Sequence, residues 1–230
     1  MPRIICFDIE TTGFDYQHGD RCIEIGAVEV IDGKITGNNF HEYINPEGKI
    51  IPPETYAVHK ISNAFLDDKP LMSEVGPKFL AYVGDSPIVA HNGLDFDFKF
   101  LNHEFEMLGL PQIPPSQQQD TLLIARNRVF GLKSYSLDSL AKWYNISLAS
   151  RADAHGALID SEILAKVYLE LQNTEPAPDI AEIVAKQHEA FLKHPKIGAD
   201  FPYRTFPVPP EEEQIHEEFM KKKILCEGKK

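Results

Sequence analysis

Cysteine and long apolar runs are scarce in this chain of 230 residues. Its three cysteines (Cys6, Cys22 and Cys226) are odd in number and form no C-x-x-C motif. This usage disfavours a disulfide framework or a structural zinc site and favours a reduced, cytoplasmic setting. No run approaches the roughly 18 apolar residues that a membrane span needs. Ile4–Phe7 is too short for the apolar region of a signal peptide. We therefore expect no membrane partner.

Positive charge is also scarce, because 23 basic residues face 35 acidic ones and the net charge is −12. A protein that holds nucleic acid through phosphate contacts is normally basic, so this balance disfavours tight binding of nucleic acid by the chain alone. It does not disfavour nuclease chemistry, since metal sites are themselves acidic and bound cations reverse the local field. If the substrate is nucleic acid, we expect a partner to hold it.

Apolar periodicity predicts an α/β fold with a mixed central sheet flanked by helices. Ile4–Phe7 has the pattern of a short buried strand, and Ile23–Ile31 alternates apolar and polar residues at period two. Asp32-Gly33 signals a hairpin turn into a strand over Phe40–Ile44. A further strand is expected over 88–90, and helices are expected from 52, over 71–83, from 96, over 136–143 and over 157–171.

The composition changes near Pro176-Ala177-Pro178, after the last strongly amphipathic stretch. The segment beyond this point has too few apolar residues to form its own core, so it either packs on the domain or serves a partner. We expect one domain over residues 1–173 and a C-terminal extension over 174–230.

Asp8 and Glu10 lie at i and i+2 where the first strand ends, so both side chains leave the same face. Two carboxylates so close repel each other unless a cation lies between them, and oxygen ligands favour Mg²⁺ or Mn²⁺. With 35 acidic residues in 230, however, this spacing is common. On spacing alone, a solvated charge pair is the default interpretation.

Two later motifs support a site. The first, H-N-G-L-D-F-D over 91–97, follows a short strand and opens a helix that carries acids. The second, H-G-A-L-I-D, places His155 five residues before Asp160. A histidine in or just before the first turn of that helix can border the same site as Asp160. We expect such a histidine to be loosely held without substrate and to act as a base.

Together, D-I-E-T-T-G, H-N-G-x-x-F-D-x-x-F-L and H-G-A-L-x-D, in this order, resemble the DEDDh (DnaQ-like) 3′→5′ exonucleases of the ribonuclease H-like fold. Within that family, G-A-V-E-V, T-G-N-N-F-H and P-E-x-x-x-V-H-x-I are similar to the epsilon proofreading subunits of bacterial DNA polymerase III. The resemblance covers roughly residues 3–171. It implies that two divalent cations, Mg²⁺ or Mn²⁺, are held by four carboxylates, with His155 as the general base. These carboxylates are Asp8, Glu10, Asp97 and Asp160.

The resemblance also implies contacts with the terminal nucleotide. Besides Asp8 and Glu10, the residues implied are Thr11, Gly13, Glu54 and His59. For Glu54 and His59, an acid at a helix N-terminus and a surface histidine are the alternative interpretations.

One motif departs from the epsilon pattern, in which Phe-Asp follows the His-Asn pair one residue earlier. Asp95 therefore competes with Asp97 for the metal-ligand role. We choose Asp97 because F-D-x-x-F-L keeps Phe100 and Leu101 on the inward side of the helix. Asp120 is expected to be either a supporting acid of the site or a helix N-cap.

The implied reaction removes nucleoside 5′-monophosphates from single-stranded or frayed 3′ ends of DNA. The acidic segment over 210–219 faintly resembles the region through which epsilon subunits bind the catalytic alpha subunit of DNA polymerase III, although a solvated charged helix fits it equally. Two alternatives remain open. One is a DEDDh ribonuclease that trims RNA 3′ ends or short oligoribonucleotides. The other is a catalytically inactive interaction module on the same fold.

Overall fold

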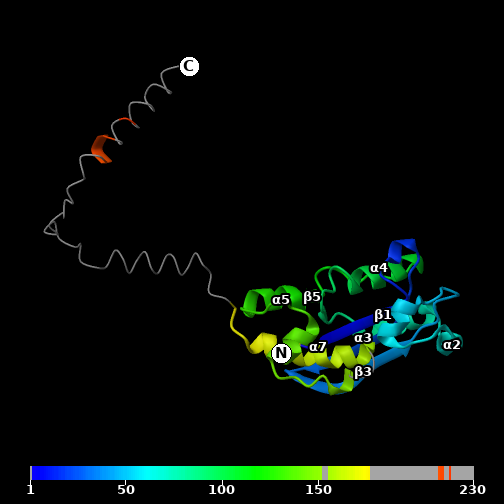
Figure 1. The fold of residues 1–230 in the computed structure, drawn as a ribbon. Helices are drawn as coiled ribbons and strands as arrows, with labels where there is room; N and C mark the ends of the chain where they lie inside the picture. The colour runs from blue at the N-terminus through cyan, green and yellow to red at the C-terminus, as the bar shows by residue number, and fades with distance from the viewer. Residues whose placement is uncertain (1, 152–154, 177–211, 215–217, 219–230) are drawn as a thin grey trace, which may run out of the picture. The chain divides into compact units, whose positions relative to one another are not determined.

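The computed structural model describes residues 2–151 and 155–176, with residues 212–214 and 218 (Figure 1). The chain divides into two units, Met1–Ala177 and Pro178–Lys230. In the second unit, residues 212–214 and 218 are helical, and the rest of the expected partner-binding segment lies outside the described residues. Within the described parts of the chain, no helix is both long enough and apolar enough to cross a membrane.

The first unit is built on a mixed five-stranded sheet with the order β3-β2-β1-β4-β5. β1 pairs antiparallel with β2, and β2 pairs antiparallel with β3, whereas β4 and β5 run parallel to β1. The predicted mixed sheet is thereby confirmed. The strands are β1 (Ile4–Thr11), β2 (Cys22–Ile31), β3 (Lys34–Tyr43), β4 (Ile88–Ala90) and β5 (Gln118–Asp120).

The meander of β1, β2 and β3 is longer than its sequence pattern predicted. β1 does not end at Phe7, because its pairing with β2 continues as far as Thr11 opposite Cys22, through a register shift after Glu10. The hairpin turn follows the prediction, with positive φ angles of 50° at Asp32 and 74° at Gly33. Asp8 and Glu10 are thus held inside a paired strand.

Seven helices and two 3₁₀ turns accompany these strands in the described part of the first unit, and four of these nine elements follow the last strand. The sequence predicted five of the helices, but α2 and α5 were not expected. The helices are α1 (Pro53–His59), α2 (Asn63–Leu66), α3 (Met72–Val83), α4 (Asp97–Met107), α5 (Thr121–Arg128), α6 (Leu137–Trp143) and α7 (Ala157–Asn173), and the turns are η1 (Tyr16–His18) and η2 (Ala149–Arg151).

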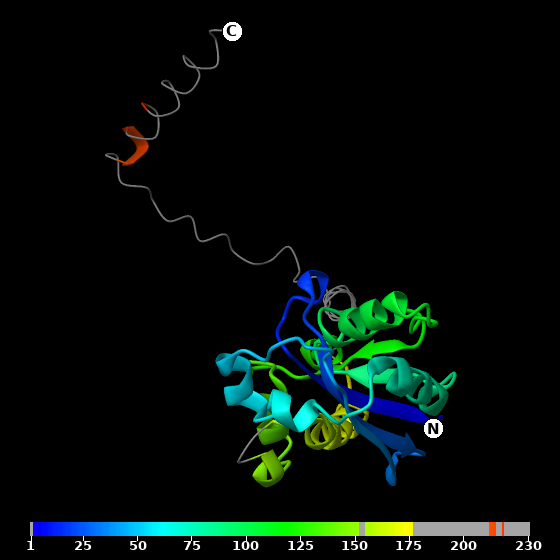
Figure 2. The ribbon, with the colours of Figure 1, turned by 90° about the vertical axis from the view of Figure 1, so that its right-hand side faces the viewer.

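Helices cover both faces of the sheet, as Figures 1 and 2 show. On one face, α3 and α4 bury Phe79 and Phe100 against Phe7 of β1. On the other face, α5, α6 and α7 pack against Cys6 and its neighbours. The thiols of Cys6 and Cys22 are free and buried. Alternate side chains of β1 therefore pack into two cores on opposite faces of the sheet. The polar ends of the strands lie at the rim between the helices.

Candidate active site

The acids that the sequence singled out come together beside β1. Asp8 and Glu10 lie on β1, Asp97 is the first residue of α4, and Asp160 lies in the first turn of α7. His155 lies two residues before α7 begins, as predicted. Donor atoms of Glu10, His155 and Asp160 lie within 4.8 Å of one another. Residues separated by 150 positions in the chain are thus brought to one place.

Gly26 lets α7 approach close enough to deliver Asp160. It pairs with Asp8 across the β1–β2 ladder. A Cβ added to Gly26 would lie 2.1 Å from the backbone nitrogen of Leu158 and 2.2 Å from the carbonyl carbon of Ala157. The hydroxyl of Ser161 also lies 2.8 Å from the Gly26 carbonyl oxygen, to which it donates. A glycine within a strand commonly marks such close backbone approach.

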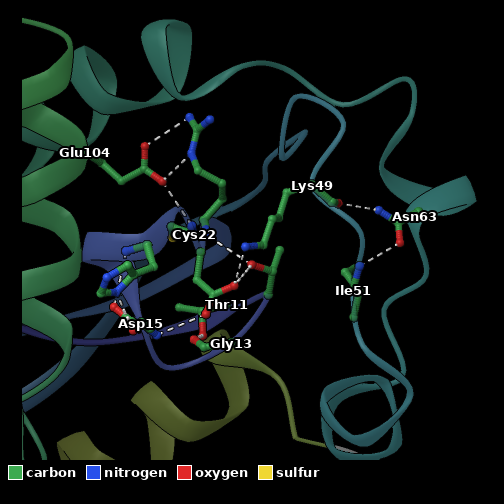
Figure 3. Close-up of polar contacts among 12 residues, drawn as sticks. Thr11, Gly13, Asp15, Cys22, Lys49, Ile51, Asn63 and Glu104 are labelled. Atoms are coloured by element: carbon green, nitrogen blue, oxygen red, sulfur yellow. Dashed lines mark hydrogen bonds and ion pairs between the residues drawn. The ribbon is translucent and has the colours of Figure 1, made fainter.

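A buried carboxylate secures α4, the helix that carries Asp97. Glu104, which is 1% exposed, accepts from the backbone N–H of Cys22 at 3.1 Å and from Nε of Arg21 at 2.9 Å. The same guanidinium reaches Glu47 at 2.7 Å. Figure 3 shows Glu104 reaching from its helix toward Cys22 at the start of β2. This charge-assisted set ties α4 to β2.

Asp120 is the N-cap of α5, and it also holds the turn before α4. Its carboxylate accepts from the backbone N–H of Leu122 at 2.8 Å. It accepts in addition from the N–H groups of Asn92 at 3.0 Å and Leu94 at 3.2 Å. The N-cap role expected for this residue is therefore confirmed, and the same side chain fixes the path of the chain into Asp97.

The two acids that compete in the second motif occupy different surroundings. Asp97 is 3% exposed, and its carboxylate accepts a hydrogen bond from the backbone N–H of Ile9 next to Asp8. The side chain of Asp95 is 78% exposed and accepts from Lys99 at 3.1 Å. Only Asp97 is therefore buried against the acids of β1.

Burial and crowding make these acids hard to ionise. Desolvation, followed by the charge of Asp97, raises the pKa of Asp8 well above its ordinary value. Desolvation and then Glu24 raise the pKa of Glu10 to about 8. Desolvation raises the pKa of Asp97 to about 7 and that of Asp160 to about 6. The site disfavours its own charged form, which a cation between the carboxylates would reverse.

Arg151, at the end of η2, is the positive side chain in this cluster. Its Nε lies 2.8 Å from Oδ1 of Asp160, and Nη2 lies 2.6 Å from Nδ1 of His155. Nη1 pairs with Asp138 in the first turn of α6. His155 was expected to be loosely held, but it contacts Arg151 and lies 3.5 Å from Oδ2 of Asp160. Burial, and then the charge of Arg151, lower the pKa of His155, so its ring is neutral at pH 7.

The donor set of this cluster fits a divalent cation. Its members offer carboxylate oxygens and one imidazole, and the donor atoms of Glu10, His155 and Asp160 lie within 4.8 Å of one another. Such oxygens suit Mg²⁺ or Mn²⁺. Asp8, Arg126, Arg151, His155 and Asp160 also line a cleft of about 600 Å³, which gives the cluster access to solvent.

Known proteins are similar to this chain in sequence. The model of the RNase T exonuclease family matches residues 5–168. The chain belongs to this exonuclease family. It is 45% identical over 172 residues to the DNA polymerase III subunit epsilon of Rickettsia felis, covering 74% of this chain and 73% of that relative. It is 41% identical over 204 residues to the same subunit of Escherichia coli, covering 84% and 82% respectively. These relatives confirm the resemblance to epsilon subunits.

Solved exonucleases have the same fold. Exonuclease X, in complex with 5′-overhanging duplex DNA, matches with a TM-score of 0.58 and 31% sequence identity, covering 75% of this chain and 92% of that chain. Exonuclease I matches with a TM-score of 0.65 over 84% of this chain and 46% of that chain, and at 16% identity this match concerns the fold alone. The predicted ribonuclease H-like fold is confirmed.

In this exonuclease, Thr11 and Gly13 form the turn that leaves β1. The hydroxyl of Thr11 donates to the Gly13 carbonyl oxygen at 2.6 Å. A Cβ at Gly13 would lie 2.3 Å from a carboxylate oxygen of Asp20. Asp20 in turn accepts from the hydroxyl of Thr12 and pairs with Lys49, each at 3.0 Å; Figure 3 shows Thr11 and Gly13 beside these contacts. Gly13 thus leaves room for the acid that shapes this turn.

His59 and Glu54 lie at opposite ends of α1. His59 is buried, its Nδ1 accepts from the N–H of Ile61 at 2.9 Å, and its Nε2 has no hydrogen-bond partner among the residues described. The N–H of His155 donates to the carbonyl of Val58 at 3.3 Å, which brings the end of α1 to the site. Glu54 is exposed in the first turn. The surface-histidine interpretation of His59 is therefore wrong.

Sequence reasoning did not find three residues that shape the exonuclease site. They are Gly26, Arg151 and Glu24. Glu24 pairs with Glu10 across the sheet, is 2% exposed and contacts Nε2 of His41 at 2.7 Å. Gly26 carried a usable signal, namely a glycine inside a strand pattern. Neither Arg151 nor Glu24 carried one, because a single charged residue has no periodicity.

Proposed function

We propose that this chain is a 3′→5′ exonuclease that removes nucleotides from DNA 3′ ends as the proofreading subunit of DNA polymerase III. The observation that carries the proposal is the convergence of Asp97, Asp160 and His155 on the Asp8–Glu10 pair, in a chain whose relatives are named epsilon subunits. Four carboxylates and a neutral histidine form a complete set of groups for phosphodiester hydrolysis.

Asp8, Glu10, Asp97 and Asp160 would hold two divalent cations, Mg²⁺ or Mn²⁺. When bound, such ions lower the pKa of water and offset negative charge on the scissile phosphate. The proposal is supported by oxygen donors that are buried, crowded and reluctant to ionise.

His155 acts as the general base in this proposal. Its lowered pKa leaves the ring neutral at pH 7, able to accept a proton from the attacking water. Attack of water on the last phosphodiester would break the bond between the phosphorus and the 3′ oxygen of the penultimate nucleotide. The terminal nucleotide would then leave as a nucleoside 5′-monophosphate. In this structure Nδ1 of His155 contacts Nη2 of Arg151 at 2.6 Å.

The substrate in this proposal is a single-stranded or frayed DNA 3′ end. The terminal nucleotide would lie against Asp8, Glu10, Thr11, Gly13, Glu54 and His59. The buried, unpartnered Nε2 of His59 supports its part in this set. The solved complex of Exonuclease X with duplex DNA supports DNA as the substrate class.

Residues 1–173 would form the exonuclease domain, and the extension over 174–230 would bind the catalytic alpha subunit. The net charge of −12 supports a partner that delivers the primer end, because the chain lacks the positive charge to grip DNA by itself.

A primer with a mispaired 3′ end tests the activity. The full chain should shorten it with Mg²⁺ or Mn²⁺ and stop in EDTA. His155→Ala should lower the rate at least about 100-fold, the usual minimum for loss of a general base. His18→Ala, which removes an exposed histidine paired with Asp15, is the matched control and should act at the wild-type rate. Full activity of His155→Ala would refute the assignment, and faster trimming of short RNA would favour a ribonuclease.

A further inference from the structure

Arg151 contacts two carboxylates and one imidazole at the carboxylate cluster. Its guanidinium meets Asp160 at 2.8 Å through Nε and His155 at 2.6 Å through Nη2, and it pairs with Asp138 through Nη1. The side chain is 13% exposed, so the guanidinium is largely withdrawn from water. No other arginine or lysine contacts these acids within the described chain.

Glu10, His155 and Asp160 are placed to bind a cation together, and we call them the cation-ligand group. The Arg151 guanidinium lies against two of them, His155 and Asp160. A guanidinium has only donors and stays positively charged, so it cannot share a ligand role and it repels a second cation nearby. Nε of Arg151 and Oδ1 of Asp160 form an ion pair at 2.8 Å. A divalent cation that binds this carboxylate must therefore compete with the guanidinium for Oδ1.

The contact with His155 also matters for the base. Because a guanidinium only donates, Nδ1 of His155 must accept from Nη2, and the neutral ring then carries its hydrogen on Nε2. In this arrangement neither ring nitrogen is free to take a proton from water. The contact that balances Asp160 thus also occupies the base.

Asp138 provides a place for Arg151 to stay when it leaves Asp160. It lies in the first turn of α6, is about half exposed and does not belong to the cation-ligand group. Because Arg151 pairs with Asp160 through Nε and with Asp138 through Nη1, it can release Asp160 and keep its ion pair with Asp138.

We propose that Arg151 is an internal cation of the carboxylate site, which a divalent metal ion must displace from Asp160 and His155 before the site is competent. The proposal rests on the proposed function, since it concerns the same carboxylates. It assigns Arg151 a positioning role, because it sets metal affinity and the state of His155 without contacting the reacting atoms.

Binding of Mn²⁺, followed by the electron paramagnetic resonance of the free ion at pH 8.5, tests this role without any turnover. Removing the competing charge with Arg151→Gln should tighten Mn²⁺ binding at least about tenfold, equivalent to about 1.4 kcal/mol. The high pH limits competition from protons at the acids. The rise in unfolding temperature on adding saturating Mn²⁺ should likewise be larger for Arg151→Gln than for the wild type.

Arg126→Gln is the matched control. It removes the same charge from the same cleft, but no ion pair of Arg126 is present in the described structure, so its Mn²⁺ affinity should equal that of the wild type. If Arg151→Gln does not fold, Arg151→Lys replaces it. The lysine side chain is shorter and cannot reach Asp138 and Asp160 together. The Mn²⁺ affinity of Arg151→Lys should therefore also rise, by a smaller factor. Equal or weaker binding by both Arg151 variants would overturn the inference, whereas a wild-type chain that binds no Mn²⁺ would count against the proposed function.

Discussion

Asp95 and Asp97 are two positions apart in the chain, but one carboxyl group is exposed and the other is buried. Asp97 is buried beside β1, whereas Asp95 faces solvent and pairs with Lys99. An exposed pair one helical turn apart contributes only about 0.3–0.5 kcal/mol. At the scale of single residues, burial beside another acid is what separates a candidate ligand from an ordinary surface charge.

Exchanging each acid for its amide separates the two roles. Asp97→Asn should lower metal-dependent trimming of a DNA 3′ end at least about 100-fold, because it removes one carboxylate from the cation site. Asp95→Asn, the matched control, should change the rate less than about twofold. Gel analysis of primer trimming at saturating Mg²⁺ measures both, and comparable losses in the two variants would contradict the choice of Asp97.

Most of the candidate site was predictable from motifs, but its balance of charge was not. Asp8, Glu10, Asp160 and His155 belong to short motifs whose order in the chain carried the prediction. Asp97 needed the inward spacing of its helix as well. Arg151 could not be found in this way, because its role depends on the packing of η2 against α6 and α7, which no local pattern encodes.

At the scale of elements, the contact between β2 and α7 decides where Asp160 lies. Gly26→Ala would place a methyl group about 2 Å from backbone atoms on the facing helix, at Ala157 and Leu158. Backbone cannot step aside as a flexible side chain can, so α7 must shift. We expect activity to fall at least about tenfold and the free energy of unfolding to fall by about 1–3 kcal/mol. Activity assays and urea denaturation measure the two effects.

Gly76→Ala is the matched control for this change. Its added methyl group would meet the ends of the Leu110 and Phe105 side chains at 3.1 and 3.2 Å, and these ends can adjust. It should keep wild-type activity. If Gly26→Ala is as active and as stable as this control, close approach of α7 is not what positions Asp160.

The elements that were predicted differ physically from those that were missed. β2 and α7 carry long apolar patterns, which packing against the core requires. β5 contains only Gln118, Gln119 and Asp120, and its backbone pairs with β4 without an apolar side chain to signal it. β1 was expected to end early because Thr11-Thr12-Gly13 has turn composition. Pairing with β2 outweighs that local preference as far as Thr11.

At the scale of the whole molecule, an excess of twelve negative charges makes unaided binding of DNA unfavourable. A chain that ends at residue 176 should keep its exonuclease rate on a short primer but fail to co-purify with the polymerase catalytic subunit. A chain that ends at residue 220 keeps the acidic segment over 210–219, and it should retain both properties. Co-purification of the shorter chain would contradict the role proposed for the extension.

Cys6 and Cys22 lie on neighbouring strands at the centre of the sheet, and both side chains are buried. Burial raises the pKa of each thiol, and only the thiolate reacts readily with alkylating reagents. Their rate of alkylation therefore reports how often the β1–β2 pair opens, peptide by peptide, in a mass spectrum. Because both thiols belong to the native sequence, opening of the sheet can be followed without substituting any residue and without measuring activity.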